Sequence, residues 1–330
     1  MTIEELLKLS AQRNASDLHL TSGFLPRLRI DGVLTEVLDA PLLDDKKCLV
    51  MLEKCMNEHV KKQLAEHWDV DFSLEVKNVG RFRVNIFYEA QGIAAAFRVI
   101  PQKIPTLKEL HLPDIIQSLT DLPHGLVLVT GPTGSGKSTT LASMINAVNH
   151  EKSAHIITIE DPIEFLYESN KSLIHQRELH KNTKSFSSAL RAALREDPDI
   201  ILVGEMRDLD TIRLALTAAE TGHLVFATLH TSSTAGSIHR IIDVFPGEER
   251  ALVRSMLSES LQAIISQTLI PKKEGGRVAA MEIMLANSAI RNLIREDKIS
   301  QMASVIQTNA AVGMQTFEQH LRSLKKEKLV

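Results

Sequence analysis

Cysteine is scarce in this chain: only Cys48 and Cys55 occur among 330 residues. They stand seven positions apart in a segment expected to be helical, which matches neither a CxxC metal knuckle nor a disulfide framework. Small proteins of oxidising compartments use far more cysteine than this. We therefore expect a protein of the reducing cytoplasm.

Long hydrophobic runs and signal-peptide features are missing as well. No apolar stretch approaches the ~18 residues that span a bilayer. The opening segment MTIEELLKLS is acidic, unlike a secretory signal. We expect this chain to contact a membrane only through partner proteins.

The chain also lacks a strong charge of one sign and has few aromatic residues. Its net charge is −3, its isoelectric point is near 6.5, and aromatic residues make up 4%. A nucleic-acid motor needs basic or aromatic side chains that follow the strand, so we expect no nucleic-acid partner. The content of 44% hydrophobic and 24% charged residues is that of an ordinary globular protein, and this length favours two domains.

The most informative feature present is GLVLVTGPTGSGKST at 125–139. An apolar strand leads into GxxxxGK[ST], the Walker A pattern, and a helix is expected to begin at Lys137. Backbone N–H groups of such a loop surround a phosphate, which side chains at the glycines would obstruct. The expected nucleotide-binding residues are Gly131, Pro132, Thr133, Gly134, Ser135, Gly136, Lys137, Ser138 and Thr139.

Two side chains of this loop have expected roles in binding a nucleoside triphosphate with Mg²⁺. Lys137 reaches the β- and γ-phosphates, and Ser138 offers its hydroxyl to Mg²⁺. The positive N-terminal end of the following helix adds to the attraction for phosphate. The alternative is a Gly-rich turn that binds nothing, but every fixed position of the pattern is filled and both flanking segments fit.

Residues 1–98 are expected to form a small α+β domain. The spacing predicts helices at 3–14 and at about 45–66. It predicts strands within 17–37, around a turn at Asp31-Gly32, and at 70–76, 80–92 and 93–100. Pro101, Pro105 and Pro113 then indicate an extended linker over 99–113.

From residue 114 to residue 330, strands alternate with helices, which predicts a parallel sheet in an α/β domain. A helix is expected at 207–221, closed by Gly222. The last ~75 residues are expected to be mostly helical. The expected central strands are the apolar runs at 125–130, 154–160, 199–205 and 223–230.

Acidic residues stand at the ends of two of these strands. Glu160, Asp161 and Glu164 belong to the second strand's end, and Glu205 to the third's. Ligands of open α/β sheets bind at such carboxyl ends, although a lone strand-end acid can equally cap a helix or lie in a solvated turn. Gly204 stands where many P-loop NTPases carry a Mg²⁺-binding Asp. Glu205 is therefore the expected acid near Mg²⁺, and another residue must activate the nucleophile.

His223 and His230 bound the fourth strand. At 3.3 Å per residue they are roughly 23 Å apart and on opposite faces, so they cannot chelate one metal unless the strand breaks between them. His230 lies at the carboxyl end, where it can sense a γ-phosphate, whereas His223 is expected to cap a helix or to pack.

Arginines supply further positive charge. Arg81, Arg83 and Arg98 lie on expected strands of the first domain, and Arg191 and Arg195 lie on an expected helix of the second. Each group is either a solvated surface or a source of guanidinium for a phosphate bound elsewhere. The residues alone leave both interpretations open.

Together these motifs resemble the secretion-superfamily ATPases, the GspE/PilT family, over nearly the whole chain. DLHL is similar to their opening signature, ITIEDPIEF to their acidic box, LREDPDIILVGEMRD to their Walker B box and TAAETGHLVFATLHT to their His box. AIRNLIRE, at 289–296, resembles the C-terminal motif of the retraction ATPases in this family. Four boxes in this order are far more specific than Walker A alone.

The resemblance implies a hexameric ATPase ring that uses ATP and Mg²⁺ to power type IV pilus retraction and twitching motility. The implied fold is a PAS-like α+β domain before a RecA-like P-loop NTPase domain. The implied location is the cytoplasmic face of the inner membrane, with an inner-membrane platform protein and an accessory paralogue as partners. Extension and secretion relatives carry a four-cysteine zinc module and a longer N-terminus, and neither is present here, which favours retraction.

The resemblance also assigns roles to residues. It makes Glu164 the general base, with Glu160 as the alternative, and Glu205 the support for Mg²⁺ and the γ-phosphate. The remaining implied nucleotide contacts are those of Lys137, of the γ-phosphate sensor His230, and of Arg81, Arg83 and Arg98, which reach a nucleotide on their own or a neighbouring subunit. The open alternatives are an accessory or non-catalytic paralogue and a RecA-fold DNA-translocating motor.

Overall fold

The computed structural model describes residues 1–30, 32–100 and 103–330, which form two compact units, Met1–Lys103 and Ile104–Val330. Residues 101 and 102, in the middle of the expected linker, lie outside the described residues. The turn expected at Asp31-Gly32 also includes one residue outside them, Asp31. The last strand of the first unit runs to Ile100, two residues past the domain boundary expected at 98.

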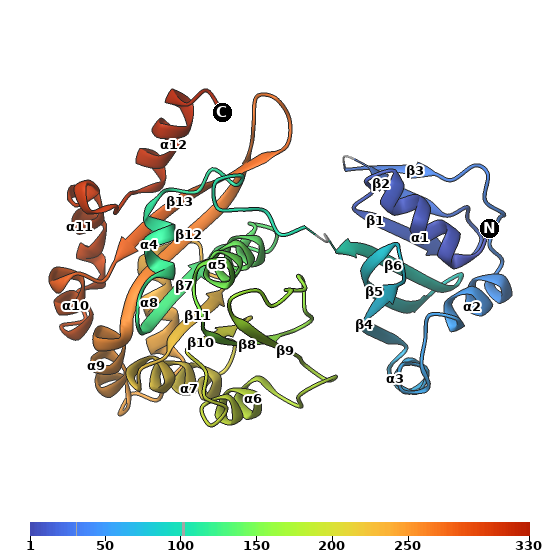
Figure 1. Cartoon of the computed structure of the whole chain (residues 1–330). Helices are drawn as coiled ribbons and strands as arrows, with labels where there is room; N and C mark the ends of the chain where they lie inside the picture. Colours follow the sequence, from blue (N-terminus) through green and yellow to red (C-terminus); the bar gives the residue numbers. More distant parts are fainter. Residues whose placement is uncertain (31, 101–102) are drawn as a thin grey trace. The chain divides into compact units, whose positions relative to one another are not determined.

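The described part of the first unit is an antiparallel sheet with helices packed against it (Figure 1). The strand order is β3-β2-β1-β6-β5-β4. The elements are α1 (Ile3–Gln12), β1 (Asp17–Thr21), β2 (Arg27–Ile30), β3 (Val33–Glu36), α2 (Asp45–Glu53), α3 (Glu58–His67), β4 (Asp69–Val76), β5 (Gly80–Glu89) and β6 (Gly92–Ile100).

The single helix expected at about 45–66 is wrong, because two helices, α2 and α3, occupy this segment. Asn57 separates them. Its backbone is extended, and its side-chain Oδ1 accepts a hydrogen bond from the N–H of Val60 at 2.9 Å. Asn57 is therefore the N-cap of α3, and its side chain satisfies a free N–H of the first turn. Because the backbone of an N-cap residue is not helical, one continuous helix cannot pass through Asn57.

The second unit is a sheet in the order β13-β12-β7-β11-β10-β8-β9, with helices on both faces (Figure 1). All neighbouring strands from β12 to β9 are parallel, and β13 joins β12 antiparallel. The predicted parallel α/β arrangement is therefore confirmed. The strands are β7 (Gly125–Thr130), β8 (His155–Glu160), β9 (Leu173–Glu178), β10 (Ile200–Val203), β11 (Leu224–Leu229), β12 (Leu261–Pro271) and β13 (Arg277–Leu285).

Helices connect and cover these strands. The helix that follows β7, α5, begins at Lys137, as the Walker A pattern predicts. The helices are α4 (Ile115–Thr120), α5 (Lys137–Glu151), α6 (Phe186–Ala193), α7 (Leu209–Glu220), α8 (Thr234–Asp243), α9 (Arg250–Ser260), α10 (Ser288–Arg295), α11 (Met302–Thr308) and α12 (Phe317–Lys326), with short 3-10 turns η1 (Ile299–Gln301) and η2 (Ala310–Val312).

The expectation of a mostly helical C-terminal segment is wrong for residues 261–285. This stretch forms β12 and β13, which pair antiparallel and extend the sheet beyond β7. Strands buried on both faces are continuous apolar runs, and periodicity alone does not distinguish such a run from a buried helix. Pairing with β7 therefore determines the structure of this stretch. The edge strand β9 was not expected either.

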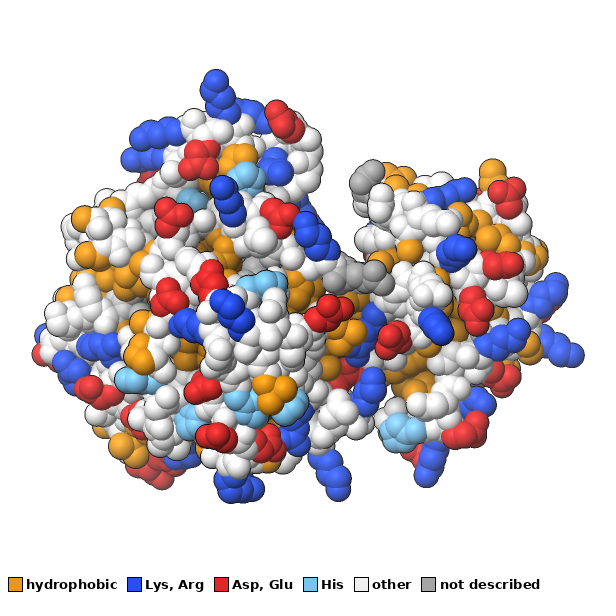
Figure 2. Space-filling view, viewed as in Figure 1, with side chains coloured by type: hydrophobic (Ala, Val, Ile, Leu, Met, Phe, Trp, Pro, Cys, Tyr) orange, Lys and Arg blue, Asp and Glu red, His pale blue; other side chains and the backbone are white. Residues whose placement is uncertain are grey.

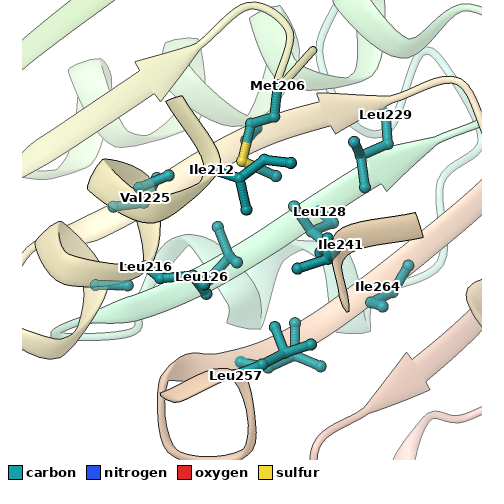
Figure 3. Packing of buried hydrophobic residues seen from close by; sticks show 14 of the residues in the cluster. Leu126, Leu128, Met206, Ile212, Leu216, Val225, Leu229, Ile241, Leu257 and Ile264 are labelled. Carbon is teal, nitrogen blue, oxygen red and sulfur yellow. The ribbon is translucent and has the colours of Figure 1, made fainter. Parts of the chain in front are cut away.

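Alternate residues of β7 pack into two hydrophobic cores on opposite faces of the sheet. Leu126 and Leu128 lie among side chains of α7, α8 and α9, including Leu216, Ile241 and Leu257 (Figure 3). Val127 and Val129 lie in the other core, with the apolar side of α5. The strand that leads into the Walker A loop is thus fixed from both sides.

Charges on the surface are mixed. In the face shown in Figure 2, Lys and Arg side chains lie among Asp and Glu side chains. Within residues 1–30, 32–100 and 103–330, no helix is both long enough and apolar enough to cross a bilayer.

Leu128→Ala is expected to lower the free energy of unfolding by about 2–5 kcal/mol, because Leu128 is 0% exposed and its loss leaves a cavity between β7 and the helices. Leu173→Ala is the matched control on β9, since Leu173 is 53% exposed; a change below about 0.5 kcal/mol is expected there. Chemical denaturation followed by circular dichroism measures both. Equal effects of the two substitutions would contradict the core described here.

Candidate nucleotide-hydrolysis site

The predicted site residues of the second unit gather at one edge of the sheet. The neighbouring strands β7, β11, β10 and β8 are parallel, so their carboxyl ends meet. The Walker A loop follows β7, His230 follows β11, Glu205 follows β10, and Glu160 ends β8. Pockets of open α/β sheets form at such an edge.

The Walker A loop is in close contact with β12. A Cβ atom at Gly131, where φ is +147°, would lie 2.3 Å from the carbonyl oxygen of Gln267 and 2.6 Å from Oγ of Ser135. No side chain fits in that space, so glycine is required. The loop ends at Gly136, which is the N-cap of α5, so the positive end of this helix faces the loop. The geometry is that of a phosphate-binding loop.

Lys137 lies folded over this loop and is 8% exposed. Its Nζ donates hydrogen bonds to the carbonyl oxygens of Gly131 at 2.9 Å and Pro132 at 3.1 Å. Burial lowers the pKa of Lys137, and the negative charges of Glu205 and Glu164 oppose this change. Both carboxylates therefore act on the Walker A ammonium.

Gln267 of β12 is a further residue of the loop's support that the sequence did not reveal. Its side chain is buried, its Nε2 donates to the carbonyl oxygen of Ser135 at 2.7 Å, and its Oε1 accepts from Oγ1 of Thr140 at 3.0 Å. One amide thus connects the loop, α5 and the sheet. It lies in the segment that was expected to be helical, so no sequence signal placed it near the Walker A loop.

Glu205 and His230 are brought together, as their positions at strand ends suggested. Oε1 of Glu205 lies 3.2 Å from Nε2 of His230, and Oε2 lies 2.7 Å from Nη2 of Arg207. Burial favours the neutral form of this carboxyl, but its contacts with Arg207 and His230 outweigh burial and lower its pKa. The carboxylate is therefore charged near neutral pH and is suited to holding a cation. Arg207 was not among the predicted site residues.

The glycine that replaces the usual aspartate of Walker B has a packing reason. A Cβ at Gly204 would lie 3.0 Å from the carbonyl oxygen of Ile159 and 3.2 Å from Cα of Glu160. The N–H of Gly204 donates to that same carbonyl at 2.8 Å. The backbone after β10 approaches the end of β8 closely, so a side chain at 204 would require the backbone at Ile159 and Glu160 to move by a few tenths of an ångström.

Glu160 and Glu164 lie in opposite environments. Glu160 is 9% exposed, and its Oε1 accepts from Oγ1 of Thr158 at 2.6 Å and from Nε2 of Gln176 at 3.2 Å. Burial raises the pKa of Glu160 to about 7, although these hydrogen bonds act in the other direction. Glu164 is exposed on the loop that follows. Only the second carboxylate is open to a water molecule.

His223 lies away from this edge. Its ring Nδ1 contacts the carbonyl oxygen of Ala218 at 3.0 Å, at the C-terminal end of α7. It binds a helix end, which is one of the two structural roles expected for it.

Arg81, Arg83 and Arg98 lie in the first unit, on β5 and β6, with Arg83 directly opposite Arg98. Each has a partner in that unit. Arg81 donates to Oγ of Ser73 at 3.0 Å, Arg83 lies 3.6 Å from Asp71, and Arg98 lies 3.0 Å from Asp17. Arg191 of α6 and Arg195 just after it are exposed.

The AIRNLIRE segment forms α10, and its apolar side is buried as the spacing predicts. Arg291 donates to the carbonyl oxygens of Ser258 and Glu259, and Arg295 lies 3.4 Å from the carboxylate of Glu259. Both arginines bind the C-terminal end of α9, where helix carbonyls lack partners within the helix.

Glu160→Gln is expected to gain stability relative to the wild type as the pH rises from 4.5 to about 7. The pKa of Glu160 is higher in the folded chain, so the folded state holds a proton that the unfolded chain releases, and wild-type stability falls over this range. At 1.36 kcal/mol per pH unit, the fall is on the order of 3 kcal/mol. Urea denaturation at about pH 5 and about pH 8 measures it. A stability difference independent of pH would refute the assignment; Glu168→Gln, an exposed change on the same loop, is the control.

Comparison with known proteins agrees with this geometry. The family model described as "Type II/IV secretion system protein" matches residues 1–326. The type IV pilus retraction ATPase PilT of Pseudomonas aeruginosa is 58% identical over 100% of this chain and 96% of its own length. A twitching motility protein of Neisseria gonorrhoeae is 54% identical over 100% of this chain and 88% of its own. Similarity to the PilU ATPase of P. aeruginosa is lower.

A solved structure also matches. The crystal structure of the pilus retraction motor PilT with bound ADP has a TM-score of 0.93 and 52% identity, covering 100% of this chain and 94% of that one. The predicted fold class, a P-loop NTPase domain after a small α+β domain, is confirmed. Both its motifs and its fold show that the chain belongs to the type II/IV secretion system family of ATPases.

Proposed function

We propose that this chain is a hexameric ATPase motor that hydrolyses ATP to drive pilin disassembly, and thereby type IV pilus retraction and twitching motility. The observation that carries the proposal is the meeting of Lys137, Glu205 and His230 at one sheet edge. The names of two similar proteins, a pilus retraction ATPase and a twitching motility protein, support the same biological role.

The Walker A residues 131–139 would hold the phosphates of ATP, and Ser138 and Glu205 would hold Mg²⁺. The loop ends at the N-terminal end of α5, which favours negative charge, and Glu205 is charged near neutral pH, so these residues fit both ligands. When bound, Mg²⁺ neutralises charge that develops on the phosphates during transfer. Lys137 would stabilise the same charge with its ammonium group.

Glu164 is the proposed general base, which takes the proton of the attacking water. Its exposure supports this role, and the burial of Glu160 argues against the alternative. His230 is the proposed γ-phosphate sensor. Because His230 shares Glu205 with Arg207, a change of charge at the phosphate would alter these contacts of Glu205 and the loop after β11.

The ring and its partners are part of the proposal. In a hexamer, Arg81, Arg83 and Arg98 would reach a nucleotide on the same or a neighbouring subunit and exchange their present partners for phosphate. The motor would act at the cytoplasmic face of the inner membrane, on an inner-membrane platform protein, alone or together with a PilU-like paralogue. An accessory PilU-like role is the second candidate; the lower similarity to PilU favours the main retraction ATPase.

Lys137→Ala is expected to abolish ATP hydrolysis and to weaken ATP binding, because it removes the ammonium over the phosphate loop. In a strain that lacks the wild-type gene, this variant should leave cells over-piliated and non-motile, as measured by pilus counts and twitching zones. Normal twitching with the variant as the sole copy would overturn the proposed role.

Glu164→Gln is expected to retain ATP but to hydrolyse it about 10²–10⁴-fold more slowly, the usual loss for a positioned base. Glu168→Gln, on the same loop, is the matched control and should keep wild-type turnover. Wild-type turnover in Glu164→Gln would make Glu160 the next base to test.

Arg98→Ala tests catalysis across a subunit boundary. If Arg98 serves a neighbouring subunit's nucleotide, mixing Arg98→Ala with Lys137→Ala subunits should restore some hydrolysis, since some interfaces then pair two intact halves. Hydrolysis by the wild type should also rise more than linearly with protein concentration as rings form. Absence of complementation in Arg81, Arg83 and Arg98 variants that still form rings would place these arginines in their own subunit's chemistry or in structure.

A further inference from the structure

The loop that carries Glu164 has no regular structure of its own. It connects β8 to β9 and spans residues 161–172. Ile163 and Phe165 are buried on either side of the exposed Glu164. A carboxylate that acts as a base needs a fixed position, so the direction of Glu164 depends on what holds the backbone at its two buried neighbours.

The edge strand β9 supplies those contacts. Nε2 of Gln176 donates to the carbonyl oxygen of Phe165 at 2.8 Å, and its Oε1 accepts from the N–H of Tyr167 at 2.9 Å. Oε2 of Glu178 accepts from the N–H of Ile163 at 3.3 Å. The backbone is therefore held one residue before and one residue after Glu164.

Successive side chains of β9 point to opposite faces of the sheet, and those that hold the loop all lie on one face. Gln176 and Glu178 stand at alternate positions, opposite Thr158 and Glu160 of β8, so they share one face. Nε2 of Gln176 also donates to the buried Oε1 of Glu160 at 3.2 Å, which connects the loop to the end of β8. Arg177, on the other face, pairs with Glu196 at 3.1 Å.

We propose that Gln176 is a positioning residue for catalysis: through its amide it holds the loop so that Glu164 points toward the water that attacks ATP. The inference rests on the proposed role of Glu164 as base. It gives the edge strand β9 a role in hydrolysis, although this strand lies outside the family motifs named in the sequence analysis. Glu178 assists from the other side of Glu164.

Gln176→Met tests the proposal, since Met keeps the length of the side chain and removes all three hydrogen bonds. The turnover number should fall about 10–100-fold, because a base displaced by about 1 Å loses up to 10²-fold in rate. The KM for ATP and the affinity for ADP should stay within about twofold, because the Walker A loop is untouched. Arg177→Met is the matched control on the same strand and should keep wild-type turnover, since Arg177 lies on the other face and pairs with Glu196.

The double variant Gln176→Met, Glu164→Gln separates positioning from a general loss of structure. If Gln176 acts through Glu164, the double variant should be no more than about twofold slower than Glu164→Gln alone. Multiplying effects would overturn the proposal, as would wild-type turnover in Gln176→Met.

Two further results keep the test decisive. If Gln176→Met does not fold, Gln176→Glu replaces it, because Glu keeps an acceptor for Tyr167 and removes both donated hydrogen bonds; the same fall in turnover is expected, and its absence overturns the proposal. Wild-type turnover in Glu164→Gln alone would instead refute the base assignment on which the inference rests. The two failures are therefore distinguished by which single variant remains active.

Discussion

Parallel pairing of β7, β11, β10 and β8 determines where the candidate catalytic residues at the strand ends of the second unit lie. Because parallel strands share a direction, the Walker A loop, His230, Glu205 and Glu160 emerge at the same edge. That pairing is stabilised from both faces by the two cores that β7 separates. A shift of one strand by one residue along its neighbour would move a catalytic group by about 3.3 Å. A displacement of that size is larger than a catalytic site tolerates.

Burial divides the acidic residues at this edge into two kinds. Glu205 contacts Arg207 and His230 and stays charged, whereas Glu160 contacts a hydroxyl and an amide and holds its proton to near neutral pH. Two carboxyls at the ends of neighbouring strands thus have different chemistry without any difference in residue type. The same separation leaves Glu164, which is exposed, as the carboxylate that meets water.

Much of this arrangement could be predicted from the sequence, since local signals carry it. The Walker A pattern places Lys137 at the start of α5, and apolar runs place Glu205 and His230 at strand ends. What could not be predicted depends on contacts between distant segments. Gln267 supports the loop only because β12 pairs with β7, and β12 looks like a buried helix in sequence. Gly204 is a departure from the usual motif until its distance to Ile159 is known.

The contacts of Arg291 and Arg295 with the end of α9 connect α10 to the central sheet through packed helices. They join α10 to α9, which packs against α7, and α7 in turn packs against β7 and β11. Leu257 of α9, Leu216 of α7 and Leu126 of β7 belong to one continuous core. Since such a core is densely packed and hardly compressible, a load applied at α10 travels along this path to the strands that carry the Walker A loop and His230. In a motor, the same two strands, β7 and β11, would then both bear the load and carry the residues that contact the phosphate.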